Sequence, residues 1–568
     1  MNYPIWSLPA PGLLIAGVAI LHVFISHFAV GGGLFLVLAE RKARREGDAA
    51  FLGYVKRHSR FFILLTLVLG AITGVGIWFT IGLVHPQATS SLINTFVWAW
   101  AIEWTFFAAE IAAAMVYYYG WDRLAPGTHL AVGWVYFGAA WLSLAVINGI
   151  LSFMLTPGAW LRTGSFWQGL LNPTYWPSVF ARTFVAVGLA GLYALATAAR
   201  LADPELKARV ARYAGRWIVP MAIALPLSIA WFLAAAQGAG VPVLEILGAP
   251  SGRVADAARA IFAGSPSGYP AALNAVRVVA AGSLLTLLAS LLVVYLRPRT
   301  YGPGAAALVL LFAFAAMGAG EWVREDLRKP YVLGGHMFVN GVRVPSRAAS
   351  PPPGTRAAAA ADRFTVTALR RDGVLKAALW TRMGEAPADP LARAEVDGRE
   401  VFRLLCASCH TVGGYLAIRP LVQGKSVEAL DKVTANLASA DGPGSGEAPW
   451  DAAPAHVGTW RGRRMPPFAG TDAERRSLAF YLARLGGAPA VLPTASAGAS
   501  PAQTYFDENC AACHGPGADF PIAGRGRSAA DLYEMLGRLP AINEMMPPFE
   551  GPDELREALA DLLAQRRE

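Results

Sequence analysis

The sequence predicts an all-α protein in which a polytopic membrane helix bundle of about eight spans is followed by two small all-α domains. Only 15% of the 568 residues are charged, whereas a soluble chain carries about 25%. The apolar excess lies in runs of about 20 residues within the first three-fifths of the chain, which is long enough for membrane helices. The remainder is polar and contains two similar segments. This composition excludes collagen, a disordered chain and a nucleic-acid-binding protein.

Eight apolar segments define the membrane spans. We place them at residues 14–38, 61–84, 94–119, 130–155, 178–199, 215–237, 272–296 and 304–323. Lys and Arg gather after spans one, three, five and seven, and these residues mark cytoplasmic loops. We therefore expect a multi-pass protein of the bacterial inner membrane, with its amino terminus and its polar domains on the periplasmic side. The first charged residue is Glu40, so we expect no cleavable signal peptide.

The polar part of the chain divides into a connector and two repeated units. We set the membrane domain at 1–335, the connector and linker at 336–391, and the two units at 392–490 and 498–568. The linker at 346–361 is rich in Pro and small residues, which indicates a spacer. The sequence assigns no role to the stretch at 364–383. Each unit combines CxxCH, a later Met-Pro-Pro-Phe and a closing amphipathic helix, which indicates internal duplication.

Both units carry the signature of covalent haem attachment. All the cysteines of the chain lie in the two CxxCH motifs, where two thiols bind the haem vinyl groups and the histidine binds the iron. A methionine thioether suits the sixth iron position and raises the potential. The expected ligand sets are Cys406, Cys409, His410 and Met465, and Cys510, Cys513, His514 and Met546. A single CxxCH could also bind zinc or form a redox dithiol, but two copies with a downstream methionine argue against this. The units resemble class I cytochromes c, which implies two covalent haems c.

Ionisable residues inside the apolar helices are the candidate membrane site. Such residues are costly in a bilayer and point to function, although each could instead be paired within the bundle. They are His22, His27, Glu103, Glu110, Arg182, Arg277, Glu321, Arg324 and Glu325. Glu103 and Glu110 share one helix face. His22 and His27 point about 140° apart, so they cannot bind one iron from the same side.

The membrane region resembles subunit I of the cytochrome bd quinol oxidases. The segments that carry the resemblance are LHVFISHFAVGGGLFLVLAE in the first helix, AIEWTFFAAEIAAAMVYYYGWDRL in the third, Asn148–Gly149 in the fourth, and EDLRKPY after the eighth. The resemblance covers about residues 10–335. It implies that His22, Glu103 and Glu325 serve two close-lying high-spin haems of b or d type. It also implies a proton route through Glu110, and Arg277 completes the candidate catalytic set of Glu103, Glu110 and Arg277.

Two departures from that family matter for function. The low-spin b haem of the family is bound by a histidine in helix five and a methionine in helix seven, but Arg182 and Val279 stand here and neither span contains His or Met. An arginine has no lone pair to offer, so we expect one or two membrane haems without the low-spin one. The segment after helix six does not match the quinol-binding loop of the family, which leaves quinol binding open.

The remaining histidines and the direction of electron flow stay open at this point. We expect His58 and His129 at the membrane interface. His85 and His336 form an alternative iron-binding pair, and His27 an alternative copper ligand. Electrons could enter from a periplasmic electron-transfer protein or cytochrome c and reduce oxygen, or leave from quinol to a periplasmic acceptor. The chain could also be a non-catalytic subunit of a respiratory complex. The resemblance implies a second membrane subunit as partner, besides the lipid bilayer.

Overall fold

The computed structural model describes residues 3–4, 6, 8–249, 252–263, 270–344, 363–385, 387–437, 465–489, 500–510, 514, 527–542, 546, 548–549 and 551–565. The predicted linker at 346–361 and Cys513 lie outside these residues. The chain divides into two compact units. The membrane unit comprises Leu13–Gly82 and Ala88–Arg328, and the polar unit comprises Met1–Gly12, Leu83–Gln87 and Lys329–Glu568.

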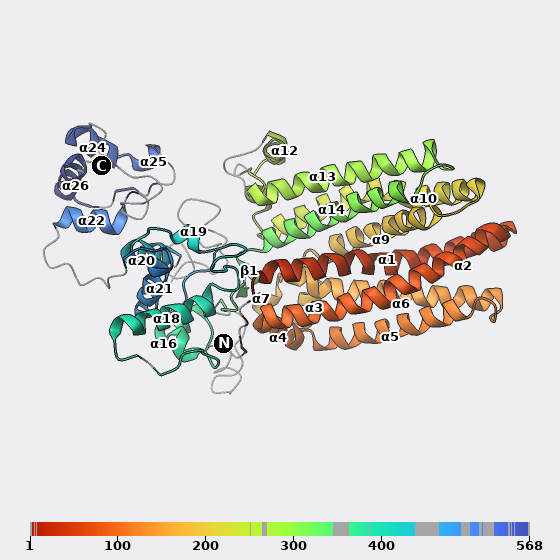
Figure 1. Cartoon of the computed structure of the whole chain (residues 1–568), viewed down its shortest axis with the longest axis horizontal. Coiled ribbons are helices and arrows are strands. Elements are labelled where there is room, and N and C mark those ends of the chain that lie inside the picture. The colour runs from red at the N-terminus through yellow and green to blue at the C-terminus, as the bar shows by residue number, and fades with distance from the viewer. Residues whose placement is uncertain are drawn as a thin grey trace. The chain divides into compact units, whose positions relative to one another are not determined.

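Eight helical segments of the described chain are long and apolar enough to cross a bilayer, which confirms the predicted number of spans. They are α1 (Pro11–Glu46), the continuous α2, η1 and α3 (Ala49–Ile63, Leu64–Gly70, Ala71–Val84), α5 (Val97–Tyr119), α6 (Pro126–Phe153), α9 (Tyr175–Ala198), α10 (Pro204–Gly238), α13 with η2 (Pro270–Leu291, Leu292–Leu296) and α14 (Pro303–Arg328). Figure 1 shows the long helices of this unit running alongside one another. The short helices α4 (Pro86–Thr95), α7 (Trp160–Thr163), α8 (Phe166–Leu170), α11 (Val243–Ile246) and α12 (Val254–Ala263) lie between them in the chain.

The membrane unit has an aromatic core and an apolar exterior. Phe28, Phe35 and Phe62 are buried where α1 packs against its neighbours. By contrast, Trp98 and Leu227 are about as exposed as side chains on the surface of a soluble protein. A helix that is apolar on every side needs an apolar solvent on its outer face. These exposed side chains therefore fit contact with lipid.

In the part of the polar unit after Lys329, the first element is a two-stranded antiparallel sheet, β1 (Tyr331–Leu333) and β2 (Met337–Phe338). Helices α16 (Val366–Asp372), α17 (Val374–Ala377), α18 (Pro390–Leu405), α19 (Arg419–Val422), α20 (Val427–Asn436) and α21 (Asp472–Leu485) follow. Phe338 and Leu369 share one hydrophobic core with Phe402 and Leu478. The stretch to which the sequence assigned no role thus forms α16 and α17 and is built into the first repeated unit.

The second repeated unit has a smaller core of its own. It contains α22 (Pro501–Asn509), α24 (Ala529–Leu536), α25 (Leu539–Ile542) and α26 (Asp553–Gln565). Phe506 of α22 packs with Leu532 of α24 and Leu559 of α26. The two repeated units and the bundle agree with the all-α class expected from the sequence, because the only described strands are the two short ones.

Candidate haem sites

The first CxxCH motif extends α18 by one turn. The N–H of Cys406 donates to the Phe402 carbonyl at 2.8 Å, and the N–H of His410 donates to the Cys406 carbonyl at 2.9 Å. His410 Nδ1 donates to the Leu416 carbonyl at 3.1 Å. A carbonyl can only accept, so the hydrogen bond fixes the proton on Nδ1 and leaves the Nε2 lone pair for iron. Burial lowers the pKa of His410, which favours the neutral imidazole that a metal requires.

A tight loop presents the carbonyl that orients His410. Leu416 has a φ of +50°, in the left-handed region, where a residue with a side chain is strained by about 1–2 kcal/mol. Thr411 braces the loop, since its hydroxyl donates to the Tyr415 carbonyl at 2.8 Å and accepts from the Gly414 N–H at 2.9 Å. Burial also raises the pKa of the Cys406 thiol to about 12. In the described chain no three His, Cys, Asp or Glu side chains gather as a metal site would need. The free Nε2 of His410 fits iron ligation by a haem attached at the CxxCH motif.

The expected sixth ligand lies just before α21. Met465 is half-buried, and Phe468, three residues on, enters the core of the unit. Helix α21 packs against α18, which carries the CxxCH motif. At their closest approach a Cβ on Gly398 would lie 1.9 Å from the Ser477 carbonyl oxygen, so only glycine fits there. The crossing holds the two ligand-bearing segments in one domain.

The second unit repeats this local geometry. The N–H of Cys510 donates to the Phe506 carbonyl at 2.8 Å, and that of His514 donates to the Cys510 carbonyl at 2.9 Å. These bonds match those of the first unit in both partners and lengths. Cys513 cannot be placed because it lies outside the described residues, and Met546 is described as half-buried. The duplicated motif thus produces a duplicated turn.

The membrane candidates His22, Glu103 and Glu110 each meet a hydroxyl group of a neighbouring helix. His22 Nδ1 lies 3.1 Å from Thr73 Oγ1 of α3. On α5, Glu103 accepts from Ser143 Oγ at 2.9 Å and Glu110 accepts from the Tyr136 hydroxyl at 3.0 Å. With the Thr73 hydroxyl donating onward to the Leu69 carbonyl at 2.7 Å, its oxygen can accept from His22 Nδ1, which would leave Nε2 for a haem iron. The donor at His22 therefore fits the haem that the resemblance implies.

Glu40, which was not among the candidate site residues, is a buried acid of α1 that contacts the C-terminal end of α5. Glu40 of α1 is fully buried and accepts from the Tyr117 hydroxyl at 2.8 Å, from His129 Nδ1 at 2.9 Å and from Arg44 Nε at 2.7 Å. His129 Nε2 lies 2.8 Å from the Tyr117 carbonyl. His129 is thus fully buried in the bundle, and so is His58, whose Nδ1 meets Thr197 Oγ1 at 2.9 Å. The position of both at the membrane interface stays a prediction. Glu40 is the first charged residue of the chain and follows a long apolar run, which was the signal available in the sequence.

The polar pairs between α5 and α6 share one register. Residue 103 pairs with 143, 110 with 136, and 117 with 129. Each step is seven residues on both helices, which is the spacing that keeps one helix face toward an antiparallel neighbour. The pairs therefore form a ladder along the interface of α5 and α6. A seven-residue recurrence of polar residues in two adjacent spans could have revealed it.

Arg182, which the resemblance aligns with a low-spin haem ligand of the family, is held in an ion-pair cluster. It lies 3.7 Å from Glu321 of α14, and Glu321 also pairs with Arg324 at 2.8 Å. Arg182 Nε and Arg324 Nη1 are buried and have no hydrogen-bond partner within the described part of the chain. Buried guanidinium N–H groups without partners are costly, so an anionic group such as a haem propionate would fit here. Arg182 itself offers no metal ligand.

The last two candidates have structural partners. Glu325 forms an ion pair with Arg328 one turn along α14, and the Glu325 side chain is 36% exposed. Arg277 of α13 donates from Nη1 to Asn274 at 2.9 Å and from Nη2 to the Ala260 carbonyl at 3.4 Å. Arg277 thus binds the carbonyl end of α12. The structure leaves its catalytic assignment a prediction.

The alternative histidine sites stay predictions. His27 Nδ1 donates to the Val23 carbonyl of its own helix at 2.7 Å. Neither His85 nor His336 belongs to a described group of three or more metal-binding side chains. Burial, together with the nearby Arg343, lowers the pKa of His336 to about 4. That imidazole is therefore neutral at physiological pH.

Comparison with known proteins identifies the domains in which these candidate sites lie. Residues 13–242 match the family model "Cytochrome bd terminal oxidase subunit I", residues 395–486 match "Cytochrome c", and residues 497–563 match "Cytochrome C oxidase, cbb3-type, subunit III". Among solved structures, the bd oxidase from Geobacillus thermodenitrificans is similar at 16% identity and a TM-score of 0.41, over 58% of this chain and 90% of that one. No curated protein matches the chain. The family matches confirm a cytochrome bd-like membrane domain followed by two cytochrome c domains, and hence a membrane protein with a haem-based redox role.

Proposed function

We propose that this chain, with a cytochrome bd-like membrane domain joined to two cytochrome c domains, is a terminal oxidase subunit fed from the periplasm. Electrons from a periplasmic protein donor pass through the two c haems to a bd-like haem pair in the membrane, where oxygen is reduced to water. The established part is the membrane haem redox role; the direction and the substrates are the proposal.

The observation that supports this proposal is an ion pair of Arg182, the residue that the resemblance aligns with the histidine ligand of the low-spin haem. Arg182 lies 3.7 Å from Glu321 of α14. A chain without the low-spin haem ligands, but with two c-type haem sites, would receive its electrons through the c haems. This supports periplasmic donors over quinol.

The residues divide into haem-binding and proton-handling groups. His22 through Nε2 and Glu325 through its carboxylate would bind the membrane haems, while Arg182 and Arg324 offer N–H groups to propionates. A bound haem pair would supply electrons and an open iron position for oxygen. Glu103 and Glu110 would hold protons on carboxylate oxygens that accept from Ser143 and Tyr136. Protons are consumed when oxygen is reduced, so carboxylates within the span serve that chemistry.

The proposed topology and partners follow from charge. The basic residues after spans one, three, five and seven favour a cytoplasmic position for those loops. The amino terminus and both cytochrome c domains then lie in the periplasm of a bacterial inner membrane, where c haems are attached and soluble donors are found. A second membrane subunit, implied by the family resemblance, is part of the proposal.

The test uses the purified full-length protein in detergent. A pyridine haemochrome spectrum should show two c haems and at least one b- or d-type haem. Reduced cytochrome c should then drive oxygen consumption, and a quinol analogue should not reduce cytochrome c. Oxygen consumption should disappear in His22→Ala while both c haems remain. Cytochrome c reduction by quinol would establish the opposite direction, and c haems alone would leave the membrane domain as an anchor.

A further inference from the structure

The two cytochrome c units differ in one respect that their shared motifs hide. Aligning the Met-Pro-Pro-Phe segments places Glu474 of the first unit opposite Leu555 of the second, whereas Arg475 matches Arg556. Glu474 is 8% exposed, which is unusual for a carboxylate. Two of the partners of this carboxylate lie in α17, a segment that precedes the first CxxCH.

Glu474 joins α21 to the beginning of α17. Its carboxylate accepts from the backbone N–H groups of Val374 at 3.0 Å, Leu375 at 2.8 Å and Thr471 at 2.9 Å. Two glycines leave space for it: a Cβ on Gly373 or on Gly470 would lie 2.8 Å from a Glu474 oxygen. Gly373 also has a φ of +89°, which only glycine adopts readily. The carboxylate is therefore seated in a cavity shaped for it.

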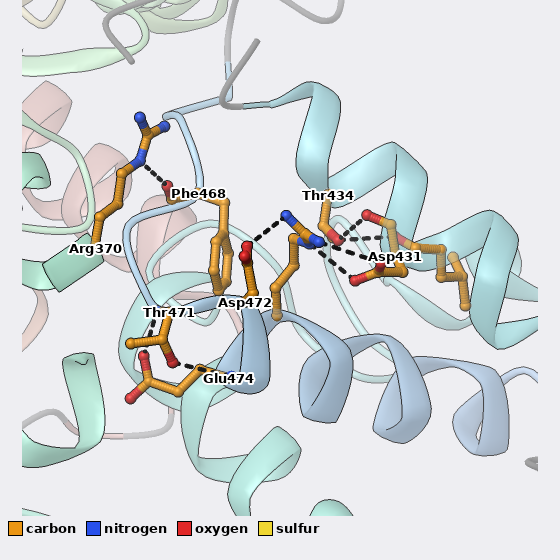
Figure 2. A network of polar contacts seen from close by, with 9 residues as sticks. Arg370, Asp431, Thr434, Phe468, Thr471, Asp472 and Glu474 are labelled. Atoms are coloured by element: carbon orange, nitrogen blue, oxygen red, sulfur yellow. Dashed lines mark hydrogen bonds and ion pairs between the residues drawn. The ribbon is translucent and has the colours of Figure 1, made fainter. Parts of the chain in front are cut away.

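A second contact links the same segment to the Met465 loop. Arg370 Nε of α16 donates to the Phe468 carbonyl at 3.4 Å. Figure 2 shows Arg370 reaching that carbonyl, with Thr471 and Glu474 at the start of α21 below it. The loop that follows Met465 is thus held at two points: its Phe468 carbonyl accepts from Arg370, and its Thr471 N–H donates to Glu474. Burial lowers the pKa of Arg370, and Asp472 opposes this.

The other end of the segment is tied to the helix that carries the CxxCH motif. Arg403 Nη2 of α18 donates to the Trp380 carbonyl at 2.9 Å, and the Arg382 N–H donates to Glu400 at 2.8 Å. The segment from Phe364 to Arg382 therefore binds both parts of the domain that carry expected iron ligands. We call this segment the clamp.

We propose that the clamp, acting through Glu474 and Arg370, is a positioning element that keeps Met465 on the first haem iron and sets that haem apart from the second. This inference rests on the proposed function in one respect, namely that Met465 is the sixth ligand of the first haem iron. The second unit has Leu555 at the Glu474 position, and a leucine can accept no hydrogen bond from a preceding segment. The first haem should hold its methionine more firmly and resist exogenous ligands, whereas the second should be more easily opened.

The test compares exogenous ligand binding and potential in the full-length oxidised protein. Met465→Ala first identifies which redox wave and which Met–iron charge-transfer band belong to the first haem. Glu474→Leu, the side chain of the second unit, should then raise imidazole affinity at the first haem at least about tenfold and lower its potential. Tenfold corresponds to about 1.4 kcal/mol. Glu474→Gln, which keeps one carbonyl acceptor, should give a smaller change in the same direction.

Matched controls separate positioning from loss of charge. Glu428→Gln removes an exposed acidic group from the first turn of α20, another helix of the same domain, so imidazole affinity should not change. The second haem should stay unaltered in all variants. If Glu474→Leu fails to mature, Arg370→Gln, which removes the donor to Phe468, carries the same expectation.

Imidazole affinity and potential that match the parent in both Glu474→Leu and Arg370→Gln would overturn the clamp. The ligand assignment fails separately, because it is refuted when Met465→Ala itself leaves the first haem unchanged.

Discussion

Replacing Gly398 by alanine should destabilise the first cytochrome c domain by forcing apart the two helices that hold its haem ligands. An added Cβ would lie 1.9 Å from the Ser477 carbonyl oxygen and 2.8 Å from Tyr481 Cβ. The obstacle at Ser477 is backbone, so it cannot move aside as a flexible side chain would. Ordinary contact begins at 3.4 Å, which means that α18 and α21 must separate by about 1.5 Å.

The magnitude follows from two opposing contributions. Overpacking costs about 1–3 kcal/mol, and a rigid backbone obstacle places Gly398 at the upper end of this range. Alanine in place of glycine within a helix returns about 1 kcal/mol through propensity. The free energy of unfolding of the domain should therefore fall by about 2 kcal/mol, which is roughly a 30-fold change in the folding equilibrium.

Guanidinium unfolding of the full-length protein in detergent, followed by haem absorbance, measures this change. The transition of the first cytochrome c domain should move to lower denaturant, and that of the second domain should stay in place as an internal reference. Gly384→Ala is the matched control, since nothing lies within 4 Å of a Cβ there. Equal midpoints for Gly398→Ala and the parent would refute the close crossing of α18 and α21.

Four further outcomes are expected. Met465→Ala and Met546→Ala should each keep the haem attached but lower its potential in a redox titration, because the soft sixth ligand is lost; unchanged potentials in both would show that other residues bind the iron. His22→Ala should remove b- or d-type absorbance and spare the c haems, and an unaltered membrane spectrum would remove the haem pair from the proposal. Glu110→Gln should slow oxygen consumption while preserving every haem spectrum, and wild-type turnover would place proton transfer elsewhere. Burial alone would raise the pKa of Glu400. The hydrogen bonds from the Arg403 guanidinium and the Arg382 N–H outweigh burial, so the pKa of Glu400 lies below its ordinary value of 4.5. Its stabilising effect is therefore complete above pH 4.5 and lost as pH falls through the depressed pKa, and Glu400→Gln should flatten that acid limb of a stability–pH curve.

The membrane architecture could be predicted because hydropathy is a local property. Each apolar run gave a span, but the helices extend beyond the runs: α10 begins at Pro204 rather than near residue 215, and α1 ends at Glu46 rather than near residue 38. The extra turns are stabilised by contacts that hydropathy does not report. Asp203 caps α10 by accepting from the Glu205 N–H at 2.9 Å. Span numbers thus follow from composition, and helix ends follow from capping.

The haem sites show the same division between local and distant information. Cys406 and His410 lie within one helical turn, so the motif alone placed them together. Glu40 and His129 are 89 residues apart, and Glu474 lies 100 residues from Val374. A single sequence does not indicate which distant residues pair. It shows only that a charged residue stands among apolar or small ones. The clamp in particular required the structure, because its sequence resembles an ordinary amphipathic stretch.

The acids inside the membrane unit differ in whether their hydrogen-bond partners carry a positive charge. Glu40 meets Arg44 and His129, so a counter-charge offsets the cost of burying its carboxylate. Glu103 and Glu110 meet only hydroxyl groups, from Ser143 and Tyr136, and no ion pair joins either acid to a cation among the described residues. A neutral hydroxyl satisfies one oxygen but leaves the charge uncompensated in the bilayer, where an unpaired ion is costly. A haem iron, which the resemblance implies beside Glu103, or a proton on the carboxyl would remove that charge. The fold therefore explains Glu40 as a structural group at the end of the ladder, whereas the proposed haem binding at Glu103 and the proposed proton route through Glu110 would account for the other two acids.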